Sequence, residues 1–299
     1  MPTPDSAILW QDHADAAAPV AIVLPAMGVR AGYYRPFADA LVAEGFHSAV
    51  VELRGQGRTD PAPRRGTDHG FAELVTEDLP AALAAARDRF PASPLLLVGH
   101  SLGGHLAALY AATATGARTR STETSAAVAQ AFSSVAGVVM IAADSPYHRV
   151  YGARGPEILA TTQFAAAVAR VLGYFPGDKL GGLGAQPRRL MLEWAHLART
   201  GRYDIAGMPC AEDELGRVRL PVLAISVAGD RVAPPASVDH LVGKLGRAEA
   251  QRWHLTRDAV DGANLNHVTW VKRSGPVAAR IASWWATKPA AAEGNSAER

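Results

Sequence analysis

Continuous apolar runs alternate along the chain with stretches in which apolar residues recur at every third or fourth position. The continuous runs are typical of strands buried on both faces, and they lie at 20–25, 48–53, 95–98, 137–142 and 221–227. We expect the last strand at 250–255. The periodic stretches predict helices, and they lie at 35–44, 71–90, 102–114, 234–245 and 274–285. This alternation predicts an α/β protein with a mostly parallel central sheet and helices on both of its faces.

One long segment interrupts the alternation. Residues 144–216 lack the pattern of strands and contain two helical runs, at 163–172 and 188–199, with glycine-rich loops between them. We expect this segment to form a helical cap that is inserted into a core made of residues 1–143 and 217–299.

Three local features refine the pattern. The short apolar run at 7–11 predicts an edge strand. Pro80 lies inside the helical stretch 71–90 and should kink or restart the helix, because proline lacks a backbone N–H group. Residues 115–134 are rich in Thr, Ser and Ala, and they predict a surface excursion with a short helix at 126–132.

The chemically most informative stretch lies where the apolar run 95–98 ends and a helix begins at once. Residues 99–103, Gly-His-Ser-Leu-Gly, match the pattern Gly-x-Ser-x-Gly, in which a serine occupies a sharp turn between strand and helix. Gly99 and Gly103 remove Cβ atoms that would collide as strand and helix approach each other. The N-terminus of the helix also directs N–H groups at negative charge. We therefore predict that Ser101 is a catalytic nucleophile.

A serine hydroxyl is a poor nucleophile unless a base takes its proton, and the base needs a carboxylate that orients it. His267 follows the last predicted strand and precedes the last helix, so we expect it at the same sheet edge as Ser101. Asp230 follows the strand 222–227 and is the expected carboxylate, while Asp144, after the preceding strand, is the alternative. The order Ser, Asp, His is typical of this architecture.

The oxyanion of a tetrahedral intermediate requires preorganised N–H donors. We expect one donor to be the backbone N–H of Leu102, directly after the nucleophile. The other should be the N–H of Met27, in the loop after the strand 20–25. Specificity should depend on the inserted segment and on the loops beside it. The candidate side chains of the substrate pocket are Tyr34, His100, Tyr147 and Trp194.

These residues resemble the motifs of the α/β-hydrolase superfamily, in particular those of its serine hydrolases. The resemblance rests on Gly-His-Ser-Leu-Gly-Gly at 99–104, Val-Ala-Gly-Asp-Arg-Val at 227–232 and Asn-His-Val at 266–268. It implies an acyl-enzyme mechanism that needs neither a cofactor nor a metal. Many members carry His-Gly-x-Gly in the oxyanion loop, where this chain has Pro-Ala-Met-Gly at 25–28. Gly-Tyr-Phe-Pro-Gly at 173–177 is similar to a subgroup of predicted hydrolases whose substrate the motif does not define.

The resulting expectation is a serine hydrolase that cleaves an acyl bond of a small molecule, in the first place a carboxylic ester. An acyltransferase or a thioesterase would use the same residues. A non-catalytic ligand-binding member and a cofactor-free oxidative enzyme are the alternatives from other classes. Ser101 argues against epoxide and haloalkane hydrolases, which have Asp at the nucleophile position.

Composition adds limits on partners and location. The net charge of +2 and the scattered arginine pairs give no basic track for nucleic acid, and the single Cys210 excludes a disulfide within the chain. The N-terminus lacks the pattern of a signal peptide, and no apolar run reaches the roughly 18 residues of a membrane span. We expect a cytoplasmic protein, and the sequence leaves open whether it is a monomer or a homodimer.

Overall fold

A seven-stranded sheet forms the centre of the computed structural model, which describes residues 7–57, 59, 62–119, 135–180 and 184–288. The strand order is β1-β3-β2-β4-β5-β8-β9; β1 pairs antiparallel with β3, and the other neighbours pair in parallel. The mostly parallel sheet that the apolar runs predict is therefore confirmed. Its strands are β1 (Ile8–Gln11), β2 (Val20–Leu24), β3 (His47–Val51), β4 (Leu95–His100), β5 (Val135–Ile141), β8 (Val222–Val227) and β9 (Ala250–Leu255).

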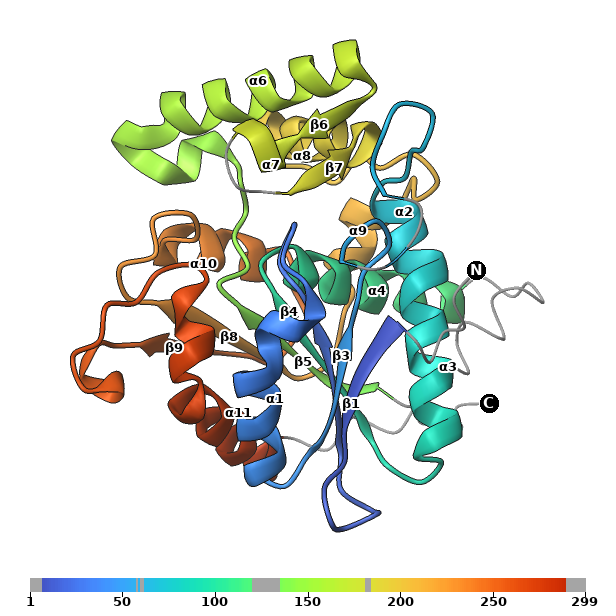
Figure 1. Ribbon diagram of the computed structural model, residues 1–299, viewed down its shortest axis with the longest axis vertical. Coiled ribbons are helices and arrows are strands. Elements are labelled where there is room, and N and C mark those ends of the chain that lie inside the picture. Colours follow the sequence, from blue (N-terminus) through green and yellow to red (C-terminus); the bar gives the residue numbers. More distant parts are fainter. Residues whose placement is uncertain (1–6, 58, 60–61, 120–134, 181–183, 289–299) are drawn as a thin grey trace.

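Helices cover both faces of the sheet (Figure 1). One face carries α1 (Arg35–Ala43) and α11 (Gly275–Thr287), and the other carries α3 (Leu79–Arg89) and α4 (Leu102–Thr119). Successive residues of a strand point to opposite faces, so Ile22 of β2 joins one apolar core and Val23 joins the other. Burial on both faces explains why the inner strands β2, β4, β5 and β8 are continuous apolar runs, whereas the edge strand β9 is largely exposed and mixed in sequence. Beyond β8, the chain forms α10 (Pro235–Gly243).

Pro80 divides the predicted helix 71–90. The chain forms α2 (Phe71–Glu73), widens into a π-helical turn over Leu74–Asp78 and continues as α3. In the wide turn the N–H of Leu79 donates to the carbonyl of Leu74, five residues earlier. Pro80 thus occupies the first turn of α3, where its missing N–H costs no hydrogen bond.

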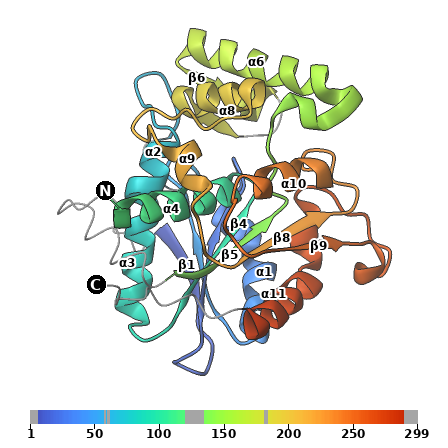
Figure 2. The same ribbon diagram turned by 180° about the vertical axis from the view of Figure 1, so that it is seen from behind.

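The long connection between β5 and β8 lies over the carboxyl ends of the strands (Figures 1 and 2). We call residues 148–200 the upper layer. It consists of a 3-10 helix (His148–Arg154), α6 (Gly155–Leu172), β6 (Tyr174–Pro176), α7 (Gly177–Leu180), β7 (Ala185–Pro187) and α8 (Arg188–Thr200). The two helical runs are present, but the segment also contains the antiparallel ribbon β6–β7, which the sequence pattern does not predict. After the layer, α9 (Ala211–Leu215) leads back to the sheet.

Shorter elements complete the described chain. The 3-10 turns lie at Ala31–Tyr34, Asp258–Val260 and Thr269–Arg273. Helix α4 extends beyond the expected stretch 102–114, and the helix expected at 126–132 lies outside the described residues. Among the helices of the described chain, none is both long and apolar enough to cross a membrane.

Candidate active site

Ser101 lies at a tight bend between β4 and α4. Its φ angle is +51°, in the left-handed region that is strained for a residue with a side chain. The bend brings backbone against backbone, because a Cβ on Gly99 would meet the carbonyl of Gly103, and a Cβ on Gly103 would meet the carbonyl of Leu24. Glycine at both positions therefore allows the bend that lifts the Ser101 side chain off the sheet.

Ser101, His267 and Asp230 form a hydrogen-bonded series. Asp230 Oδ2 lies 2.8 Å from Nδ1 of His267, and Nε2 of the same ring lies 2.9 Å from Ser101 Oγ. Because a carboxylate can only accept, Nδ1 carries the proton and Nε2 accepts the hydroxyl proton. This arrangement can pass a proton from the hydroxyl to the imidazole, which is the first requirement of nucleophilic attack by serine.

The carboxylate of Asp230 is held rigidly. Its side chain is fully buried, and Oδ1 accepts hydrogen bonds from the N–H groups of Val232 and Ala233 at 2.8 and 2.9 Å. The loop after β8 thus fixes one carboxylate oxygen and directs the other at His267. Asp144, the alternative carboxylate, accepts instead from the hydroxyl of Tyr151 at 2.6 Å.

Burial and charge act in opposite directions on His267. Burial favours the neutral ring, but the hydrogen bond and the charge of Asp230, together with the charge of Asp144, outweigh it and raise the pKa of His267. Burial also raises the pKa of Asp144, to about 6, although the Tyr151 hydroxyl opposes the shift. Two carboxyl groups thus favour positive charge on the His267 imidazole.

Two backbone N–H groups flank the serine. Leu102 begins α4, so its N–H has no acceptor within the helix, and Met27 lies in the loop after β2. Within the described residues, neither N–H donates to a backbone acceptor, and both residues line the same cavity as Ser101 and His267. The pair suits the binding of a negatively charged oxygen.

Comparisons with known proteins concern the sequence of one part of the chain and the fold of the whole. The sequence model of a family described as serine aminopeptidase, S33, matches residues 15–160. A carboxylesterase structure from the thaumarchaeon Nitrososphaera gargenis is 16% identical, with a TM-score of 0.55 over 93% of this chain and 94% of that chain. Est1E of Butyrivibrio proteoclasticus, described with ferulic acid bound, is 14% identical, with a TM-score of 0.58 over 92% and 93%.

A structure from the metagenome-derived lipolytic enzymes LipS and LipT is 19% identical, with a TM-score of 0.58 over 95% of this chain and 98% of that chain. The fold is thus shared over nearly the whole length of both chains. The chain has the α/β-hydrolase fold. The comparison with curated protein sequences gives no match.

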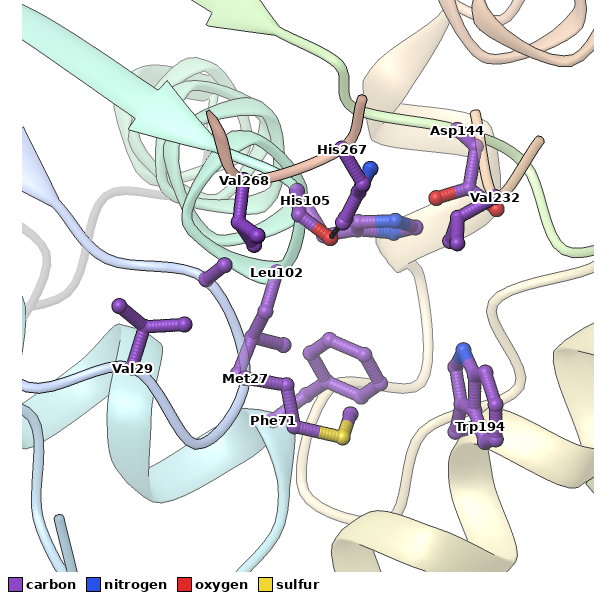
Figure 3. Close-up of a pocket in the computed structure, with 12 residues that line it drawn as sticks. Met27, Val29, Phe71, Leu102, His105, Asp144, Trp194, Val232, His267 and Val268 are labelled. Atoms are coloured by element: carbon purple, nitrogen blue, oxygen red, sulfur yellow. Dashed lines mark hydrogen bonds between the residues drawn. The ribbon is translucent and has the colours of Figure 1, made fainter. Parts of the chain in front are cut away.

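The protein has a cavity of about 150 Å³ beside Ser101, between the sheet and the upper layer. Figure 3 shows Val29 and Trp194 at opposite sides of this cavity, with Met27 and Phe71 between them. Eight apolar residues surround a small polar group, so the cavity suits an apolar ligand that presents one polar bond to Ser101. The lining residues are Ala26, Met27, Val29, Phe71, Ser101, Leu102, His105, Asp144, Trp194, Val232, His267 and Val268.

Of the four side chains expected in the substrate pocket, Trp194 on α8 lines the cavity. Tyr34 and His100 do not, because both are buried in the core behind the bend, where they are hydrogen-bonded to each other. Tyr147 does not line it either, since its ring packs against Gly201 and His240.

Several lining residues were not expected from the sequence. His105 follows Ser101 by one helical turn, and this spacing could have placed it on the same face of α4. Its Nδ1 lies 2.5 Å from the hydroxyl of Tyr203, and burial lowers the pKa of His105 to about 4, so the ring is neutral at pH 7. Phe71 reaches the cavity from the start of α2 and Val232 from the loop after β8, and no local pattern in the sequence marks either residue as part of a pocket. Among the described residues, no cluster of His, Cys, Asp and Glu could hold a metal ion.

Proposed function

We propose that this α/β-hydrolase is a serine hydrolase that cleaves carboxylic esters through a covalent acyl-enzyme. The observation that carries the proposal is the series Asp230–His267–Ser101, which ends at a cavity beside two N–H groups that donate to no backbone acceptor among the described residues. Each part corresponds to one need of acyl transfer: a nucleophile, a base, a group that orients the base, and donors for the oxyanion.

The reaction begins when Ser101 Oγ attacks the ester carbonyl and His267 Nε2 takes the hydroxyl proton. The N–H groups of Met27 and Leu102 stabilise the oxyanion of the tetrahedral intermediate. The intermediate collapses as His267 gives its proton to the departing alkoxide, which leaves as the alcohol. Water, deprotonated by the same imidazole, then attacks the acyl-serine and releases the acid. Asp230 keeps the ring oriented and stabilises the imidazolium in both halves of the cycle.

The size and the lining of the cavity favour a substrate with a small, apolar acyl group. A space of about 150 Å³ is about the size that a single benzene ring fills in an engineered apolar cavity of another protein. We propose further that residues 144–216 act as a cap, with Trp194 as its main contact to substrate. A short straight acyl group or a single ring fits within this space, whereas a long acyl chain would extend beyond it.

The substrate profile over ester chain length tests this function. We expect kcat/KM for nitrophenyl butyrate to exceed that for nitrophenyl dodecanoate by at least about tenfold, since each misplaced methylene costs binding in the transition state. Trp194→Ala should move the preference towards longer chains. Phe164→Ala is the matched control, because Phe164 is an aromatic residue of the same layer, 60% exposed and absent from the cavity lining.

The alternatives make different predictions in the same assays. An acyltransferase would give more ester of an added alcohol than free acid. A binding protein without activity would leave all esters intact and would not react at Ser101 with a fluorophosphonate probe. Absence of both turnover and labelling would contradict the proposed function.

The pH dependence of hydrolysis follows from the surroundings of His267. Only the neutral imidazole can accept the Ser101 proton, and Asp230 raises the pKa of the ring. We therefore expect kcat/KM to rise with pH and to reach half of its maximum above the ordinary histidine value of about 6.5. Asp230→Asn should lower this midpoint. A midpoint below 6.5 in the unmodified protein would contradict the expectation.

A further inference from the structure

A hydrogen-bonded series behind Ser101 joins the three loops of the site. The N–H of Ala26 donates to the hydroxyl oxygen of Tyr34 at 2.8 Å, and this oxygen lies 2.7 Å from Nδ1 of His100. The other ring nitrogen of His100, Nε2, lies 2.7 Å from the backbone carbonyl oxygen of His267. Both side chains are buried, with Tyr34 0% and His100 1% exposed. We call this series the Tyr34–His100 bridge.

The direction of every proton in the bridge can be assigned. The His267 carbonyl can only accept, so Nε2 of His100 carries the ring proton and donates it. Nδ1 is then an acceptor and takes the proton of the Tyr34 hydroxyl, which in turn accepts from Ala26. The indole N–H of Trp270 lies 3.4 Å from Nε2, but this nitrogen has no free lone pair in that tautomer. All donors therefore point the same way, from the loop after β2 towards His267.

The bridge stays in one protonation state while His267 titrates. Burial and the charge of the nearby His267 keep the pKa of His100 well below its ordinary value, against the effect of the bond to the His267 carbonyl. Burial raises the pKa of Tyr34 above its ordinary value. Both side chains are neutral at every pH at which an imidazole can serve as a base, so the bridge is a fixed support and not a switch.

The residues of the bridge lie next to the groups that the proposed reaction uses. Ala26 directly precedes Met27, the expected oxyanion donor; His100 directly precedes Ser101; and the acceptor carbonyl belongs to His267 itself. We propose that Tyr34 and His100 are positioning residues, which set the oxyanion loop and the base at a fixed distance from the nucleophile. The inference rests on the proposed function and concerns the same site.

Two features separate this role from ordinary core packing. The bridge consists of short bonds between groups from three distant segments, and both of its side chains are buried, so a lost partner is costly there. Oxyanion donors also act only within a narrow range of distance, and a misplacement of about 1 Å can cost on the order of 100-fold in rate. Loss of the bridge should therefore slow the chemical step before it affects substrate binding.

Tyr34→Phe tests the proposal, because it removes the hydroxyl and keeps the ring. We expect kcat for nitrophenyl butyrate to fall about 10- to 100-fold, while KM stays within about twofold. Tyr110→Phe is the matched control: Tyr110 is also buried, but its ring lies in the apolar core on the opposite face of the sheet, on α4. This control should keep kcat within about twofold, with the melting temperature of both variants recorded.

A second variant covers the case in which Tyr34→Phe does not fold. His100→Gln keeps an N–H donor for the His267 carbonyl but loses the fixed ring, so kcat should again fall by at least about tenfold with KM little changed. The proposal is overturned if either folded variant retains full kcat, or if Tyr110→Phe lowers kcat as much as Tyr34→Phe does. The proposed function fails in a different way, since the unmodified protein would then hydrolyse no ester.

Discussion

Replacement of Ser101 by alanine is expected to lower kcat for ester hydrolysis by about five orders of magnitude or more, because no other group at the site can form the acyl-enzyme. His267 and the oxyanion donors would remain in place, so binding of substrate should change little. The measurement is the rate of nitrophenol release under saturating ester. Retention of more than a few per cent of the activity would show that Ser101 is not the nucleophile.

A second substitution at Ser101 tests the backbone strain at the bend through the stability of the protein. Ser101 has a φ of +51°, a conformation that glycine adopts without strain. Ser101→Gly should therefore be as inactive as Ser101→Ala but more stable than it, by about 1 kcal/mol. Thermal unfolding of the two variants measures this difference. Equal or reversed stability would mean that the bend is not strained in the way its φ angle indicates.

Replacement of Asp230 by asparagine is expected to lower kcat by about 10⁴-fold, the loss known for the same change in a protease triad. Oδ1 of Asp230 accepts two backbone N–H groups, so the amide oxygen of asparagine must take that place. The amide NH₂ group would then face His267 Nδ1 and force the proton onto Nε2. The imidazole could no longer accept from Ser101.

Asp144→Asn is the matched comparison, since Asp144 is the second buried carboxyl group near His267. It accepts from Tyr151 and not from the imidazole, so its replacement should cost less than about tenfold through the lost charge alone. A larger loss in Asp144→Asn than in Asp230→Asn would assign the orienting role to Asp144.

Much of the fold could be predicted because its signals are local. A strand buried on both faces is expected to be a continuous apolar run, and this rule located the central strands β2, β4 and β8 to within a few residues. The ribbon β6–β7 escaped prediction because each strand has three residues, ends in proline and depends on its partner for its conformation. The long helices of the upper layer had a periodic signal, and the ribbon had none.

The residues of the candidate site also differ in whether the sequence carries a local signal for them. Residues at strand ends could be selected from the chain order, and Ser101, Asp230 and His267 do lie in contact. The assignment of Tyr34 and His100 to the pocket was wrong, since both are buried in the core. For His100 a signal existed, because neighbours in a strand point to opposite sides and His100 ends the strand directly before Ser101. For Tyr34, burial is decided by the packing of distant elements.

The place at which the upper layer is connected to the sheet affects which changes of sequence the fold can accept. The layer leaves from β5 and returns through β8, two strands that are hydrogen-bonded neighbours. Insertions, deletions or whole exchanges within the layer therefore leave the pairing of the strands unaltered. Trp194 lies in this layer, whereas Ser101 and His267 lie at the ends of strands of the sheet and in the loops that follow them. If the proposed function holds, a change within the layer can alter substrate preference while the positions of Ser101 and His267 stay the same.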